Sequence, residues 1–452
     1  MPAFSAISQP HIWAADIWDA YFLNDIINLY TIYIYMYRIL AINPGSTSTK
    51  IAVYDDDQPI LTTSLGHKPE DLARFATVPD QFEWRKDLIE ETLAKHDIDI
   101  KSINAVIGRG GVSKPVESGV YEVNDDMTHD LIYARVQHAS NLGGLIAREI
   151  AREIGVKAYI ADPVVVDEMI PYARISGVPE LPRESVFHAL NQKAIARLFA
   201  KENGTPYEEL NLIVCHLGGG ITASAHRRGR VMDTTNALDG CGPFSPERSG
   251  SLPPGPLIKL CFSGKYTEDQ LHRLVHGGGG LMAHLGTTSV PEVLERIDNG
   301  DLHAMLVLRA MCYTVAKAIG TMAIALKGDV DAILITGGMA HSKRITDFIA
   351  EHVDFIAPIY VYPGENELKS LAENALAVLR GERQAKLYVS EDNEDPVNIN
   401  DTSRPSKLRE WLHAAITPKN IRANATMTAV RQYLRKFNIS RPKFRFGQRD
   451  RD

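Results

Sequence analysis

One sequence pattern occurs twice in this chain: an apolar strand, a short turn of small residues and a second strand, as in a β-hairpin. The first copy spans Leu40–Asp55, where the turn begins Pro-Gly and is rich in hydroxyl side chains. The second spans Leu212–Ala225 and turns through three glycines. Backbone N–H groups and hydroxyls that converge in such a turn form a cup suited to a phosphate. The sequence contains no Walker-type loop, and the alternation after Lys50 predicts a strand rather than a helix. Two such hairpins predict two similar halves with a ligand cleft between them.

Strands and helices alternate over residues 37–387, which is typical of an α/β fold. The expected elements are strands at 37–43, 105–108, 156–161 and 212–217, and a helix over 142–154 that the pair Ser140-Asn141 could cap. A third strand ends in glycines within Ala332–Ala340. Glycines at the carboxyl end of a strand let a nucleotide approach the backbone. Together with the two hairpins, this junction predicts that a nucleotide binds with its triphosphate between the two halves and its nucleoside against the second half.

The net charge and the cysteine content indicate which ligands and which cellular compartment to expect. A net charge of -7 and a pI near 6.1 argue against a nucleic-acid-binding body, so any anionic ligand must be held locally. The four cysteines are widely separated and lack the spacing of a zinc site or a disulfide scaffold. A reducing cytoplasm is therefore expected.

Both ends of the chain differ from its body. Residues 1–36 are rich in aromatic and β-branched residues, but acidic residues interrupt them and no Lys or Arg precedes Arg38, so neither a secretory signal nor a membrane span is expected. The interpretation favoured is an upstream extension, with an anchor or a partner-binding helix as the alternative. Residues 404–452 hold 13 Lys or Arg against three acids and few large aliphatics, which predicts a poorly packed basic tail rather than a nucleic-acid arm.

Four segments together resemble the acetate and butyrate kinase family, within the larger group that contains sugar kinases, actin and the heat-shock ATPases. They are residues 43–50, 215–220, 247–250 and 335–342. The likeness covers about 37–388 and is closer to the butyrate kinase branch. Acetate kinases carry His-Arg-x-x-His-Gly-Gly where this chain has Gly108-Arg109-Gly110-Gly111, and a second histidine where it has Gln192. A role of that second histidine cannot be carried over.

The resemblance implies an α/β fold of two similar ribonuclease H-like or actin-like ATPase domains, with mixed sheets flanked by helices and a central cleft. The first domain would span 37–186, carry the substrate side and be completed by a C-terminal helix at 366–388. The second, nucleotide-side domain would span 187–365, and 1–36 and 389–452 have no counterpart. The implied reaction transfers the γ-phosphoryl group of ATP to butanoate, giving butanoyl phosphate and ADP, and is reversible.

Two arginines are the first candidates for catalysis, because carboxylate, γ-phosphate and leaving ADP are all anionic. Arg109 follows a strand in a glycine-rich turn, and Arg248 lies in a loop between Pro246 and Gly250. An arginine more often forms a surface ion pair, but both residues match family motifs. We assign Arg109 mainly to the substrate carboxylate and Arg248 to the transferring phosphoryl group; the two roles could be exchanged.

Two acids are candidates for magnesium. Asp162 ends a strand before Pro163 and matches the catalytic aspartate of the family, although Asp-Pro is also a common turn pair. Glu367 matches the glutamate that the family places near the metal, with Glu365 as the alternative. A glutamate at a helix start can equally serve the helix dipole.

The remaining candidates would bind phosphate. His188 and His216 could donate to the γ-phosphate, although a lone histidine near apolar residues is more often a core side chain. Lys50 could equally reach solvent from a strand. The predicted nucleotide-binding residues are Asn43, Ser46, Ser48, Lys50, Gly218, Gly219, Gly220, Gly337 and Gly338. A further run, Gly277–Gly280, lacks a preceding strand and is interpreted as a flexible bend.

Other activities stay open on the sequence alone. Isobutanoate or another branched acid, acetate and propionate are alternative substrates, because one methylene separates acids by only about 1–3 kcal/mol. A chaperone-like or actin-like ATPase switch and a passive nucleotide-binding module are alternatives of other classes. The expected partners are ATP or ADP, Mg²⁺ and a short-chain acid, with a homo-oligomer of the chain and neither nucleic acid nor membrane.

Overall fold

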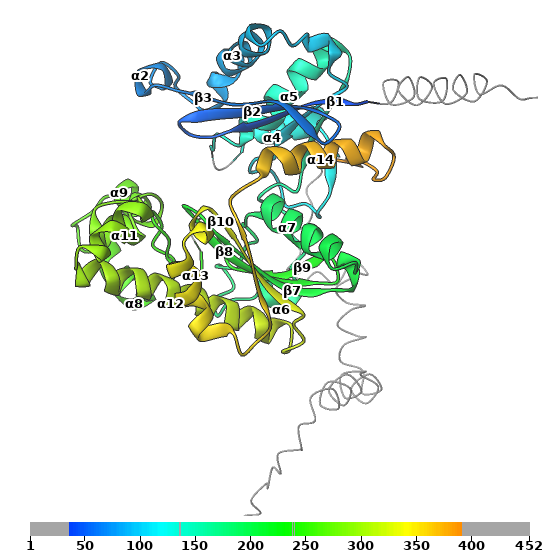
Figure 1. The fold of residues 1–452 in the computed structure, drawn as a ribbon. Helices are drawn as coiled ribbons and strands as arrows, with labels where there is room; N and C mark the ends of the chain where they lie inside the picture. The colour runs from blue at the N-terminus through cyan, green and yellow to red at the C-terminus, as the bar shows by residue number, and fades with distance from the viewer. Residues whose placement is uncertain (1–35, 135–136, 237, 239, 391–452) are drawn as a thin grey trace, which may run out of the picture. The chain divides into compact units, whose positions relative to one another are not determined.

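Two mixed sheets organise the part of the chain that the computed structural model describes, residues 36–390 apart from 135–136, 237 and 239. The first sheet has the order β12-β5-β6-β4-β1-β2-β3 and the second β11-β10-β7-β8-β9 (Figure 1). The strands are β1 Arg38–Pro44, β2 Ser48–Asp55, β3 Gln58–Gly66, β4 Ala105–Arg109, β5 Val120–Glu122, β6 Lys157–Ala161, β7 Asn211–Leu217, β8 Ile221–Arg227, β9 Arg230–Thr234, β10 Ala332–Gly337, β11 Ile359–Pro363 and β12 Lys386–Leu387.

Both sheets contain the same run of strands. An antiparallel meander is followed by two parallel strands, as β3-β2-β1-β4-β6 in the first sheet and β9-β8-β7-β10-β11 in the second. Each predicted hairpin forms, with Asn43 opposite Lys50 in one and His216 opposite Thr222 in the other. The predicted α/β fold with two similar sheets is therefore confirmed.

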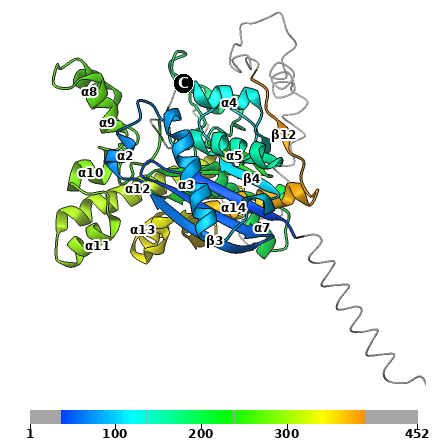
Figure 2. The same cartoon turned by 90° about the horizontal axis from the view of Figure 1, so that it is seen from above.

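Helices cover both faces of each sheet. They are α2 Pro69–Leu72, α3 Phe82–Lys95, α4 Asp125–Ile132, α5 Asn141–Ile154, α6 Pro171–Arg174, α7 Ala189–Glu202, α8 Pro254–Cys261, α9 Glu268–Val275, α10 Gly280–Leu285, α11 Val290–Asp298, α12 Leu302–Ala325, α13 Lys343–Val353 and α14 Glu367–Leu379. In the first sheet, Leu40 and Ile42 of β1 face the core shared with α3 and α5, while Ile39 and Ala41 face α14 (Figures 1 and 2). This two-residue alternation lets one short strand bind helices on both sides.

The second sheet follows the same rule. Ile213 and Cys215 of β7 pack into the core that contains α12 and α13, while Leu212 and Val214 pack against α7. Among the described residues, α12 alone is long and apolar enough to cross a membrane, but half of its most apolar window is buried inside the protein. Because a core helix of a soluble protein has the same properties, α12 is weak evidence for a membrane span.

Local predictions differ from the structure in small ways. Helix α5 begins at Asn141, one residue before the expected start, and the Ser140 side chain makes no capping hydrogen bond. Its hydroxyl instead contacts Nδ1 of His138 at 2.9 Å. Residues 1–35 and 391–452 lie outside the described part, so the predictions for both extensions stay predictions.

Candidate active site

The turn of the first hairpin is supported from beneath by a buried arginine. Arg85 of α3 is 1% exposed and donates to the Gly45 carbonyl at 2.9 Å and to the Thr49 hydroxyl at 3.0 Å. Burial lowers the pKa of Arg85 to about 10. Above this support, the candidates Ser46 and Lys50 are exposed and Ser48 is half-buried. The hairpin thus presents its hydroxyls and one ammonium group outward from a fixed backbone.

Three predicted residues from distant segments meet at the mouth of this hairpin. The side-chain amide of Asn43 donates to Oε2 of Glu367, the first residue of α14. Arg109, at the end of β4, places Nη1 3.2 Å from the same oxygen and 3.4 Å from Oδ1 of Asn43. The guanidinium is therefore aimed by a carboxylate and an amide before any substrate arrives.

His216 of the second hairpin stacks on His188, the residue that precedes α7. The rings of His188 and His216 lie 3.9 Å apart at an interplanar angle of 17°. Nδ1 of His216 contacts Oδ1 of Asn191 at 2.8 Å, and its Nε2 lies 3.1 Å from Oε1 of Glu365. The hydrogen bond from His216 lowers the pKa of Glu365, and Arg109 and Lys50 lower it further. Glu365 and Glu367 thus link the two hairpins through one short segment.

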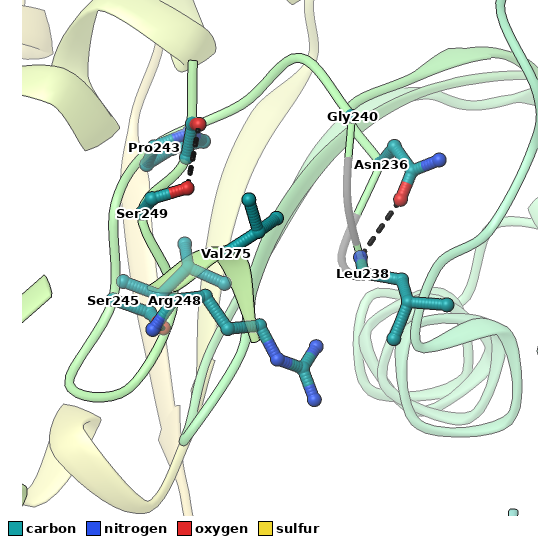
Figure 3. A pocket seen from close by; sticks show the side chains of 10 residues that line it. Asn236, Leu238, Gly240, Pro243, Ser245, Arg248, Ser249 and Val275 are labelled. Carbon is teal, nitrogen blue, oxygen red and sulfur yellow. Dashed lines mark hydrogen bonds between the residues drawn. The ribbon is translucent and has the colours of Figure 1, made fainter. Parts of the chain in front are cut away.

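Arg248 approaches from a loop of the second half. Figure 3 shows its guanidinium extending across the pocket toward Leu238. The loop lies tightly on the tetraglycine run: Gly280 has φ +61°, and a Cβ there would lie 1.7 Å from the Ser245 carbonyl oxygen. Gly277 and Gly279 also donate to the Glu247 carbonyl. Gly277–Gly280 therefore provides the close packing that holds the Arg248 loop.

Electrostatic effects connect Arg248 with the other candidates. Burial, and then the positive charges of Arg109 and Arg248, lower the pKa of His138. Burial, His216 and the same two arginines lower the pKa of His188 well below its usual value. Arg109, at the end of β4, and Arg248, in a loop of the second half, therefore both lie close enough to influence His188 and His138, and the sequence analysis did not predict His138.

Known proteins show which family has this arrangement. A sequence model of the acetokinase family matches residues 180–399. Butyrate kinase 2 of Clostridium acetobutylicum is 53% identical over 354 residues, which cover 78% of this chain and 99% of that protein. The chain belongs to the acetate and butyrate kinase family. A probable butyrate kinase of Bacteroides thetaiotaomicron is 54% identical over 352 residues, covering 78% of this chain and 99% of that protein.

The fold of this family member agrees with a solved acetate kinase structure. The crystal structure of Porphyromonas gingivalis acetate kinase has a TM-score of 0.63 and 18% identity, and covers 76% of this chain and 100% of that one. Identity at this level supports the actin-like ATPase fold alone. The pattern shared by both sheets agrees with it.

One predicted site residue of this kinase, Asp162, has its side chain directed away from the others. Asp162 has a fully buried carboxylate that accepts from the Ser118 hydroxyl at 2.6 Å, the Gly119 amide at 2.9 Å and Arg197 at 3.1 Å. Burial alone would raise the pKa of Asp162, but Arg197 and Lys193 hold it below its usual value. Asp162 directly follows Ala161, the register partner of Arg109, but its carboxylate points to Arg197 of α7 and is 0% exposed, which leaves a metal ion no access to it.

The acids near the hairpins fit magnesium better than Asp162 does. Among the residues that the structure describes, no three His, Cys, Asp or Glu side chains lie together so that they could hold a metal ion. Magnesium usually takes only one or two carboxylates and completes its shell with water and substrate phosphates. Glu367 and Glu365 supply hard oxygen donors beside the predicted phosphate hairpins. These two residues fit the ion, and Asp162 does not.

The predicted glycines have different surroundings. A Cβ on Gly218 would lie 2.8 Å from Nε2 of His216, and one on Gly219 would lie 3.3 Å from Oε1 of Glu247. The amide of Gly218 donates to the Gly220 carbonyl at 3.0 Å. Gly337 exchanges two backbone hydrogen bonds with Gly364, which precedes Glu365. The third strand–glycine junction therefore lies beside the segment that links the hairpins.

Proposed function

We propose that this protein is a butyrate kinase that transfers the γ-phosphoryl group of ATP to butanoate, giving butanoyl phosphate and ADP, and that catalyses the reverse reaction. One observation carries the proposal. Glu367 and Glu365, on one short segment, contact Asn43 and Arg109 at the first hairpin and His216 at the second, and the charge of Arg248 reaches His188, which stacks on His216. Relatives 53–54% identical over nearly their whole length are named butyrate kinases, which favours this reaction over an ATPase switch.

Anionic groups must be brought together for this reaction. A carboxylic acid is ionised near pH 7, so its oxygen can attack phosphorus without a strong general base. Arg109 would bind the carboxylate with its planar fork, because Glu367 and Asn43 already orient the guanidinium. Arg248 would neutralise charge on the transferring group. The exchange of these two roles remains the alternative.

The hairpins and histidines would hold the nucleotide. Backbone amides and hydroxyls of the first hairpin, with Lys50, would bind triphosphate oxygens, and the junction at Gly337 and Gly338 would receive the nucleoside. His188 would donate to the γ-phosphate, and His216 would do so only after its Nε2 leaves Oε1 of Glu365. Glu367, or Glu365, would hold Mg²⁺, which when bound neutralises phosphate charge. Closure of the two halves would exclude water as a competing acceptor.

The setting of the reaction completes the proposal. A cytoplasmic enzyme that acts on small molecules, without a nucleic-acid or membrane partner, is expected from the charge and cysteine usage. A homo-oligomer, a dimer or a higher symmetric assembly, is expected from the resemblance to the family. The division into a substrate-side domain at 37–186 with α14 and a nucleotide-side domain at 187–365 also stays a prediction.

Acyl phosphate trapped as the hydroxamate tests the reaction across acids of two to six carbons with ATP and magnesium. We expect the highest kcat/KM with butanoate. Arg109→Ala should lose about 10- to 100-fold in kcat/KM, because a hydrogen bond to a charged group contributes about 1.5–3 kcal/mol. Arg152→Ala is the matched control, since this arginine of α5 pairs with Glu149 on an exposed face. Near-normal turnover by Arg109→Ala would reject the assignment, and no product from any acid would reject the function.

A further inference from the structure

A buried chain of hydrogen bonds runs through the second half of the protein and ends at His188. We propose that Thr222 and Gln192 are positioning residues that fix the hydrogen of His188 on Nε2, so that this ring presents a neutral N–H donor to the transferring phosphoryl group. The proposal deepens the proposed function and rests on it for the identity of the acceptor. Neither residue was among the site residues predicted from the sequence.

The chain has four consecutive contacts. The Tyr207 hydroxyl lies 2.7 Å from Nδ1 of His226, and Nε2 of His226 lies 3.1 Å from Oε1 of Gln192. The Gln192 amide donates to the Thr222 hydroxyl at 2.8 Å, and that hydroxyl lies 2.9 Å from Nδ1 of His188. Gln192, Thr222 and His226 are all 0% exposed. Because water has no access to these groups, their hydrogens must satisfy one another.

The orientation of the Gln192 amide follows from a backbone neighbour. Its Nε2 atom lies 3.3 Å from the Thr222 carbonyl oxygen as well as 2.8 Å from the Thr222 hydroxyl. A carbonyl oxygen only accepts, so the reversed amide would place two acceptors against each other. The amide nitrogen therefore faces Thr222 and the amide oxygen faces His226.

With the amide in this orientation, the other hydrogens of the chain can be assigned to acceptors. The Thr222 hydroxyl receives a hydrogen bond from Gln192, so its own hydrogen is available for Nδ1 of His188. An Nδ1 that accepts leaves the hydrogen of a neutral imidazole on Nε2. At the other end, His226 donates from Nε2 to the Gln192 oxygen and accepts at Nδ1 from Tyr207. Every donor in the chain meets an acceptor under this arrangement.

Burial and charge support the neutral state. The pKa values of His188 and His226 are both lowered well below the usual range, first by burial and then by positive neighbours. Burial raises the pKa of Tyr207 well above its usual value, so its hydroxyl keeps the hydrogen. Because a neutral His188 carries one ring hydrogen, the nitrogen that bears it decides whether the ring can donate to a phosphate oxygen. With the hydrogen on Nδ1, the ring would turn a lone pair toward a phosphate oxygen.

The free side of His188 is placed for this role. Within the described part of the chain, its side chain hydrogen-bonds only through Nδ1, and the residue is half-buried rather than enclosed. Its ring stacks on His216, whose Nε2 faces Glu365. Glutamine at 192 holds a donor and an acceptor at once without titrating, which the second histidine of the acetate kinases could not do in the same way.

The wild-type protein alone gives the first test. Long-range ¹H–¹⁵N NMR of histidine-labelled full-length protein, assigned with His188→Gln, distinguishes a nitrogen that bears hydrogen from one that does not. We expect His188 to bear hydrogen on Nε2 only. Hydrogen on Nδ1, or an imidazolium at neutral pH, would overturn the proposal. This readout needs no turnover, so its result and the failure of the proposed kinase reaction are distinguishable.

Variants then connect the tautomer to the reaction. Thr222→Val removes the hydroxyl, and we expect mixed tautomers of His188 and a kcat about tenfold lower, with the KM values for ATP and butanoate little changed. Thr222→Ser restores the hydroxyl and should restore both tautomer and kcat. Thr92→Val, which removes a buried hydroxyl bonded to Leu88 within α3, is the matched control. An unchanged kcat in folded Thr222→Val, or an equal loss in Thr92→Val, would overturn the proposal.

Discussion

Gly337 and Gly338 are adjacent at the carboxyl end of β10, but the structure gives them different reasons to be glycine. Gly337 has φ +94° and ψ 173°, a region that is essentially restricted to glycine. A Cβ there would lie 2.4 Å from the Leu217 carbonyl oxygen. A Cβ on Gly338 would meet no atom within 4 Å. Only the second position is open, and the open space is where we place the nucleoside.

The two alanine variants should therefore fail in different assays. For Gly337→Ala, backbone strain of about 1–3 kcal/mol adds to overpacking of about 1–3 kcal/mol. A loss of about 2–6 kcal/mol in the free energy of unfolding follows. Gly338→Ala should be neutral or gain about 0.4–1 kcal/mol, because alanine restricts the unfolded chain. With nucleotide, its methyl group should raise the KM for ATP about tenfold, which corresponds to about 1.4 kcal/mol.

Urea unfolding without ligand measures the first effect, and steady-state kinetics at saturating butanoate measures the second. The KM for butanoate serves as an internal control in Gly338→Ala and should stay unchanged. A wild-type KM for ATP in this variant would refute the placement of the nucleoside. Wild-type stability in Gly337→Ala would refute the strain argument.

Three further outcomes are expected. Lys193→Met should cost about 3–5 kcal/mol in urea unfolding, because it leaves Glu168 buried without its 2.7 Å ion pair, and adding Glu168→Leu should recover most of the loss. Glu367→Gln should raise the magnesium concentration needed for half-maximal rate, and an unchanged magnesium titration would contradict our metal assignment. His67 has its pKa lowered to about 4, mainly by burial, so between pH 6.5 and 4 the unfolded chain binds more protons than the folded one. As the pH decreases through this window, the free energy of unfolding should therefore decrease, and at pH 5 this group alone should have cost about 2 kcal/mol. His67→Gln should make the free energy of unfolding depend less on pH.

The sequence predicted the fold because its information was local. Alternating apolar residues on either side of a small-residue turn specify a hairpin, and the register Asn43 to Lys50 follows from the turn. The second hairpin repeats this logic. The family, the fold class and the carboxylate kinase reaction were predicted correctly from four short segments.

The orientation of the Asp162 side chain could not be predicted from the residues near it in the sequence. Its position after β6 is the one the sequence predicts, but the direction of its carboxylate depends on Arg197, which lies in α7 of the other half. A buried acid turns toward the donors that satisfy it, and such donors cannot be read from neighbouring residues. The close packing at Gly280 could not be predicted for the same reason, because the segment it packs on, around Ser245, is distant in the sequence.

The duplicated hairpins differ in what supports them, and that difference matches what each must do. Arg85 beneath the first hairpin forms no ion pair within the described residues, so its charge adds to the field that a triphosphate meets throughout the reaction. Beside the second hairpin, the hydrogen-bond chain that ends at His188 consists of neutral groups, among them Gln192 and Thr222. A neutral donor interacts most strongly with an oxygen when charge accumulates there, as it does on the transferring group. If the hairpins bind phosphate as we propose, the cation beside the first turn would favour binding and the fixed tautomer of His188 would favour transfer, so Thr222→Val should lower kcat and a neutral replacement of Arg85 should weaken nucleotide binding.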